Sequence, residues 1–223
     1  MNPETRRKTS FLAGFVLYFG VLWVLWDTSL IYPLKVFVVL LHEVSHGLMA
    51  VLTGGSIDHI TLNAQEGGAC YCPGGNRFLT LSAGYLGSLA WGVALILLAQ
   101  ARRVPAKRVI AVIGGLVIIL TLGVVRSGFG IAYGVGFGAV LMAVGMQLNP
   151  GFNRSVLRIL GLTSCLYAIL DIKSDVLDRP GLESDAAMLA DLTGVPTLMW
   201  GVIWIVIALT VSGLLFRRVF RAA

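Results

Sequence analysis

The residues of this sequence best suited to chemistry are His42, Glu43 and His46, which lie within five positions of one another. On an α-helix, residues four apart lie on the same face, about one turn from each other. His42 and His46 can therefore direct their imidazoles at one metal ion, while Glu43 reaches the edge of the same site. This His-Glu-x-x-His spacing is typical of zinc hydrolases, in which the carboxylate acts as a general base.

The motif lies in the middle of an apolar run, residues 33–52. Imidazole and carboxylate groups are costly in hydrocarbon and rarely occur there without a partner or a water-filled cavity. An uncompensated glutamate costs at least ~2.5 kcal/mol on membrane-insertion scales. This cost favours a functional site over the alternative interpretation, a chance match or a polar packing contact between helices.

The composition lies outside the range of soluble globular proteins, because 57% of the 223 residues are hydrophobic, 13% are charged and the mean hydropathy is +0.86. A transmembrane helix needs about 20 mostly apolar residues, and the sequence offers six or seven such stretches. We therefore expect an all-α polytopic membrane protein with six or seven transmembrane helices. The net charge of +6 comes from short clusters at the ends of these stretches, which indicates membrane topology and headgroup contacts rather than nucleic-acid binding.

Seven spans would place the two basic termini on opposite membrane surfaces, which conflicts with the tendency of basic segments to share the cytoplasmic side. A re-entrant span or a merged pair of spans would remove the conflict. The expected spans cover residues 11–26, 33–52, 78–99, 109–125, 128–147, 156–170 and 198–216.

Between the second and third spans, the hydropathy falls and apolar residues alternate with polar ones from Ile57 to Leu62, followed by a segment rich in Gly and Pro. This pattern predicts a small β-hairpin. Cys70 and Cys72 lie in its second half. Because two cysteines one residue apart are poorly placed for an unstrained disulfide, we expect free thiols.

A third metal ligand must come from outside the motif, because a catalytic zinc site usually has three protein ligands. Asp171 is our choice, since it ends an apolar span and its carboxylate can lie at membrane depth. Asp175, one turn further on, is the main alternative, and Asp185 is less favoured because it lies in a polar segment, residues 173–196. The other interpretation of Asp171 is a solvated carboxylate at a helix end, or an ion-pair partner of a nearby basic residue.

These features resemble the site-2 protease family of intramembrane zinc metallopeptidases, most closely the branch called peptidase M50B-like. The resemblance spans roughly residues 38–204. The sequence departs from the better-known members at Asn149-Pro150-Gly151, which lacks the carboxylate of their Asn-Pro-Asp-Gly motif. The matching segments are the His42–His46 motif, Leu52–Gly55, the Gly-rich hairpin, Ala83–Gly87, Asp171–Asp175 and Ser184–Ala186.

The resemblance implies that residues 1–223 form a single membrane-embedded metallopeptidase-like domain with a three-helix catalytic core. It implies a Zn²⁺ cofactor held by His42, His46 and Asp171, with Glu43 as the catalytic base. The partners would be the lipid bilayer, here of a bacterial cell membrane, and a transmembrane protein substrate. The hairpin would present that substrate as an extended strand by edge pairing.

Two rival functions remain open at this stage. One is a zinc-binding but non-proteolytic membrane protein, such as an adaptor or a chaperone-like protein. The other is a structural membrane protein without a metal. A bound metal would exclude the structural protein without a metal. Peptide cleavage would exclude the non-proteolytic zinc-binding protein.

Overall fold

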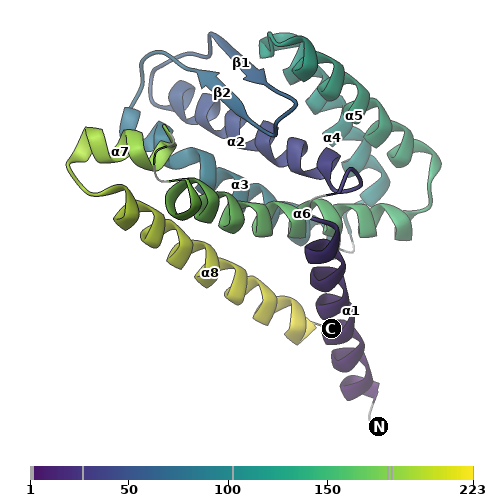
Figure 1. Cartoon of the computed structure of the whole chain (residues 1–223). Helices are drawn as coiled ribbons and strands as arrows, with labels where there is room; N and C mark the ends of the chain where they lie inside the picture. The colour runs from purple at the N-terminus through teal and green to yellow at the C-terminus, as the bar shows by residue number, and fades with distance from the viewer. Residues whose placement is uncertain (1–2, 27, 102, 180, 182, 223) are drawn as a thin grey trace.

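The computed structural model describes residues 3–26, 28–101, 103–179, 181 and 183–222. Figure 1 shows a helical molecule with a small β-hairpin lying along α2. In chain order the elements are α1 (Pro3–Leu25), α2 (Tyr32–Leu52), β1 (His59–Leu62), β2 (Gly68–Tyr71), α3 (Arg77–Gln100), α4 (Ala106–Val124), α5 (Gly128–Gln147), α6 (Pro150–Lys173), the π-helical turn η1 (Ser174–Asp178), α7 (Asp185–Thr193) and α8 (Thr197–Ala222).

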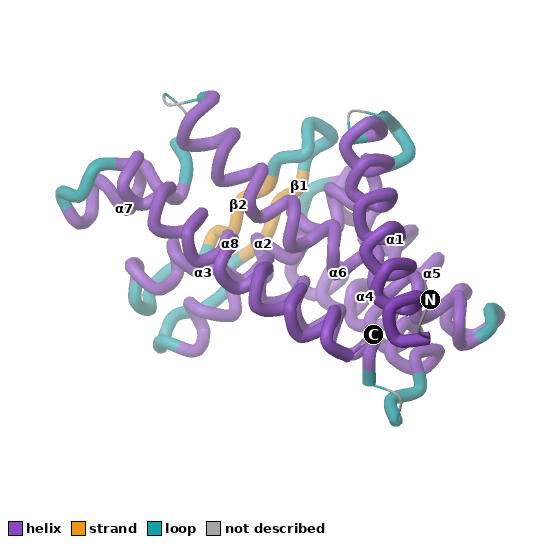
Figure 2. The backbone as a smooth tube through the Cα atoms, turned by 90° about the horizontal axis from the view of Figure 1, so that it is seen from below, coloured by secondary structure: helices purple, strands orange, loops and turns teal. Residues whose placement is uncertain are grey.

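Among the described residues, six helices are long and apolar enough to cross a membrane: α2, α3, α4, α5, α6 extended by η1, and α8. This confirms the expected all-α polytopic membrane fold, with the hairpin between α2 and α3. The first expected span falls in α1. The apolar part of α1, Leu12–Leu25, is shorter than each of these six helices. Figures 1 and 2 place the start of α1 and the end of α8 at the same end of the molecule. With six spans instead of seven, the start of α2 and the end of α8 would lie on the same side of a membrane.

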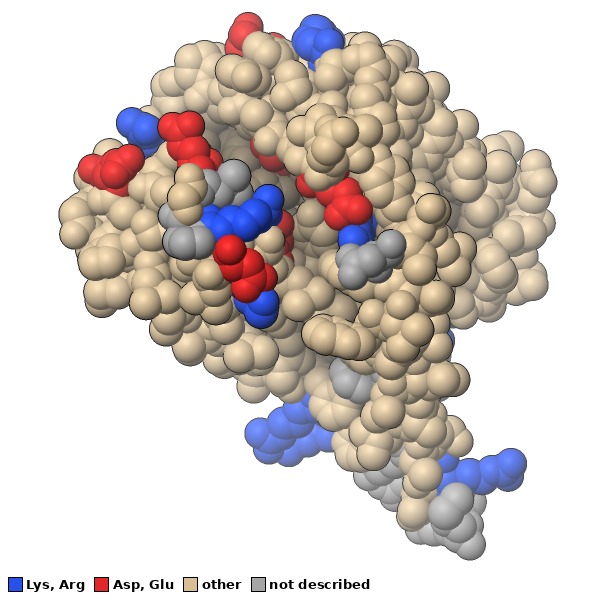
Figure 3. Space-filling model, viewed as in Figure 1, with Lys and Arg blue, Asp and Glu red and all other residues tan. Residues whose placement is uncertain are grey.

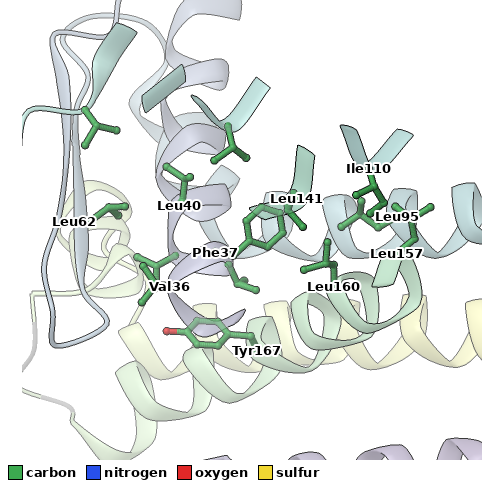
Figure 4. Packing of buried hydrophobic residues seen from close by; sticks show 14 of the residues in the cluster. Val36, Phe37, Leu40, Leu62, Leu95, Ile110, Leu141, Leu157, Leu160 and Tyr167 are labelled. Carbon is green, nitrogen blue, oxygen red and sulfur yellow. The ribbon is translucent and has the colours of Figure 1, made fainter. Parts of the chain in front are cut away.

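The helices that are most buried are α2, α3 and α6. In the apolar 18-residue stretch of each helix, 61% of the residues are buried in α2, 56% in α3 and 50% in α6, against 17% in α8. Figure 4 shows Val36, Phe37 and Leu40 of α2 packed among side chains of the neighbouring helices. The His-Glu-x-x-His motif therefore lies on the innermost helix, where packing on several sides fixes its backbone.

The hairpin is antiparallel, and its register pairs His59 with Tyr71 and Leu62 with Gly68. Ile60 is fully buried against the helical core, which anchors β1. The outer edge of β1 is occupied, because the Arg126 N–H donates to the Ile60 carbonyl at 3.0 Å. The other edge, on β2, has no strand partner in the described part of the chain. The predicted hairpin is confirmed, and one of its edges is open.

The expectation of free thiols in this hairpin is wrong. The structure joins Cys70 and Cys72 by a disulfide. The chain bends after β2 into Pro73 and two glycines with positive φ, Gly74 and Gly75. The two Cα atoms lie 5.5 Å apart, a separation usual for disulfides.

Candidate metal centre

The structure brings three possible metal ligands together. The His42 Nε2 atom lies 3.0 Å from Asp185 Oδ2, and the His46 Nε2 atom lies 3.2 Å from the same oxygen. The ligand atoms of all three residues lie within 4.8 Å of one another. His42 and His46 belong to α2, whereas Asp185 is the first residue of α7, 143 positions after His42.

This donor set fits a zinc ion. Two ligands at 2.0 to 2.1 Å from a tetrahedral zinc lie about 3.3 Å apart, close to the separations observed here. The second nitrogen of His46 is also satisfied, because its Nδ1–H donates to the Thr80 carbonyl at 2.7 Å. Such a hydrogen bond fixes the ring orientation and leaves Nε2 available to a metal.

The local sequence explains why Asp185 points into the site. Ser184 caps α7 by accepting a hydrogen bond from the Ala187 N–H, so Asp185 begins the helix, where the helix dipole favours a negative charge. Ala186 and Leu189 are fully buried and hold α7 against the bundle. Burial alone would raise the pKa of the Asp185 carboxyl, but the imidazoles of His46 and His42 lower it below its ordinary value. Asp185 is thus held as an anion.

The two aspartates favoured by the sequence occupy other positions. Asp171 Oδ2 lies 3.8 Å from Nδ1 of His42, on the side of the ring away from Asp185. Asp175 accepts a hydrogen bond from the Tyr85 hydroxyl at 2.6 Å and pairs with Arg179 at 2.6 Å. The cluster therefore contains Asp185 rather than Asp171 or Asp175. The sequence signal for Asp185 was the Ser-Asp pair at the start of α7. This pair marks the beginning of a capped helix, but it does not show that the helix packs against the inner part of the bundle.

Glu43 lies beneath the hairpin. Its side chain is buried. Gly68 allows this approach, because an added Cβ there would lie 2.7 Å from Glu43 Oε1. Strand β2 and the base are therefore in direct contact.

The metal centre opens into a cavity of about 970 Å³, lined by the motif, Asp171, Asp185 and the hairpin. Figure 3 shows a hollow on this face with charged side chains around it. Glu66, Arg179 and Glu183 belong to its lining. A polar opening of this size can admit water to the motif.

Replacing Gly84 with alanine should weaken metal binding at least ~10-fold, because the added Cβ would contact the His42 ring and lie 2.6 Å from His46 Cε1. Zinc content after dialysis of purified protein measures the effect. Gly115→Ala is the matched control, since nothing lies within 4 Å of the Cβ it adds. Equal zinc retention by the two variants would contradict the arrangement of the site.

The fold and the site together define a multi-pass membrane protein with a candidate His-His-Asp metal centre inside its helix bundle. A family model described as Peptidase M50B-like matches residues 15–215, and the chain belongs to that family. This confirms the resemblance found in the sequence. Comparison with curated proteins and with solved structures gave no match.

Proposed function

We propose that this protein is an intramembrane zinc metalloprotease that hydrolyses peptide bonds in or near the transmembrane segments of other proteins of a bacterial cell membrane. The observation that carries the proposal is the convergence of His42, His46 and Asp185 at hydrogen-bonding distances, beside Glu43 and inside an open cavity. Membership of a peptidase family supports it.

His42, His46 and Asp185 would hold the zinc ion. When bound, zinc supplies Lewis-acid polarisation of a substrate carbonyl and lowers the pKa of a bound water. Glu43 accepts the proton of the attacking water and passes it to the nitrogen of the leaving amine.

Asp171 acts on His42 in this proposal rather than on the metal. Its carboxylate faces the ring nitrogen that Asp185 does not face. A carboxylate behind a metal-binding histidine fixes the ring orientation and raises its basicity. This role replaces the direct ligation that the sequence favoured for Asp171.

The open edge of β2 is the proposed docking site for the substrate. In β1, the Ile60 carbonyl points away from β2 and accepts a hydrogen bond from Arg126. Cys70, which lies opposite Ile60, therefore directs its own backbone N–H and C=O away from β1. Gly68, two residues before Cys70, does the same. These groups line the cavity. An extended segment of a transmembrane protein can pair with this edge and bring its backbone next to Glu43.

Removing the metal tests the proposal. We expect a chelator to abolish cleavage of a helical membrane substrate by the purified protein, and added Zn²⁺ to restore it. Thermal unfolding should shift to lower temperature in the metal-free protein, because the metal binds the native state. An adaptor or chaperone-like protein would show the thermal shift without any cleavage, and a structural protein without a metal would show neither effect.

A further inference from the structure

A second cavity lies at the end of the bundle remote from the hairpin and α7. It has a volume of about 540 Å³ and is bounded by the α3–α4 loop, the start of α4, the end of α5 and the start of α6. Because consecutive spans alternate in direction, these segments share one membrane surface with the end of α8. The cavity shares no lining residue with the metal centre.

In the part of the chain that the structure describes, every charged side chain that lines this cavity is basic. Arg103, Lys107, Arg108 and Arg154 line it, and no acidic residue occurs between Glu66 and Asp171 in the sequence. Among the residues that the structure describes, the side chains of Arg103, Lys107 and Arg108 form no hydrogen bond or ion pair. Four cations around one cavity repel one another, so a bound anion would stabilise this end of the bundle.

The backbone adds to this positive charge. Helix α4 begins after Pro105, which provides no side-chain cap for the first N–H groups. By contrast, the neighbouring helix α6 is capped, because Asn149 accepts from the Phe152 N–H at 2.9 Å. Uncapped N–H groups at a helix start favour phosphate and other anions.

The cavity also has an apolar side. Met146 lines it and is 68% exposed, and Ala111 lies beside the basic residues. In a membrane protein, an exposed apolar side chain near the end of a span can contact lipid acyl chains. Cations next to such a surface suit an amphiphile with an anionic head better than a soluble anion.

We propose that this cavity binds the phosphate of an anionic phospholipid. Lys107, Arg108 and the start of α4 contact the phosphate, and the acyl chains lie along Met146. Arg154, which also lines the cavity, donates a hydrogen bond to the Ala99 carbonyl at 3.2 Å. The site is independent of the proposed proteolysis.

Native mass spectrometry and thermal unfolding of the purified full chain test this proposal. Phosphatidylglycerol should stay bound and raise the unfolding temperature, whereas phosphatidylcholine with the same acyl chains and inorganic phosphate should do neither. The double variant Lys107→Gln/Arg108→Gln should bind phosphatidylglycerol about 30-fold more weakly, since each basic residue near the surface contributes about fivefold.

The matched control is Arg217→Gln/Arg218→Gln, which removes the same charge from exposed residues on the same membrane surface. This variant should retain phosphatidylglycerol. If both double variants lost phosphatidylglycerol binding equally, the lipid would be held by general attraction to a basic surface, and the proposal would be overturned. If inorganic phosphate raised the unfolding temperature as much as phosphatidylglycerol does, the ligand would be a soluble anion instead of a lipid. Should the double variant not fold, Lys107→Gln alone carries the same comparison, with an expected loss of about fivefold.

Discussion

Replacing Glu43 with glutamine should reduce peptide hydrolysis by about 10²- to 10⁴-fold while leaving the metal and the fold in place. Glutamine has nearly the same shape as glutamate, so it fits the same buried position against Gly68. It cannot take up the proton of the attacking water. The imidazoles and Asp185 keep their positions, so zinc binding is retained.

Cleavage rate and zinc content should be measured on the same preparations in defined lipid. Glu66→Gln is the control, because Glu66 lines the same cavity but pairs with Lys35 at 3.2 Å, away from the motif. This control should cleave at nearly the parent rate. If Glu43→Gln cleaves a helical substrate as fast as the parent, the proposed protease function is wrong.

Replacing Asp185 with asparagine should lower zinc affinity more than 100-fold, because it removes the anionic member of the ligand set. Asp171→Asn should lower it about 10- to 100-fold, the effect usual for a residue that orients a metal ligand. Asp175→Asn should change it least, since Asp175 bonds Tyr85 and Arg179 instead.

Competition with a chromophoric zinc chelator gives the three affinities directly. The order Asp185, Asp171, Asp175 is the expected ranking of losses. A larger loss for Asp171→Asn than for Asp185→Asn would return the third ligand to Asp171, as the sequence suggested. Circular dichroism of the metal-free variants controls for unfolding.

The membrane fold could be predicted from the sequence, because each span is a long apolar stretch that hydropathy alone reveals. The hairpin could be predicted for a similar reason, since alternation and a Gly- and Pro-rich segment are local signals. The start of α7 at Ser184 and its end at Gly194 also follow from capping chemistry. All of these features depend on residues close together in the chain.

The placement of Asp185 could not be predicted, because it depends on tertiary packing. Hydropathy marks residues 173–196 as polar, which suggested a surface position. The structure turns α7 back against the bundle through Ala186 and Leu189, so that a polar segment delivers a carboxylate to the inner helix. The disulfide at Cys70 was missed for a related reason, since the spacing of the cysteines does not show the backbone conformation that brings their Cα atoms to 5.5 Å.

The distance in the chain between His42 and Asp185 has a consequence for biosynthesis. Asp185 follows five of the six candidate spans found in the described residues. Chains are made and inserted from the N-terminus onward, so a nascent chain carries the histidines and Glu43 long before it can complete the ligand set. Hydrolytic competence would therefore arise only late in membrane insertion, and incomplete translation products would remain inert toward neighbouring proteins.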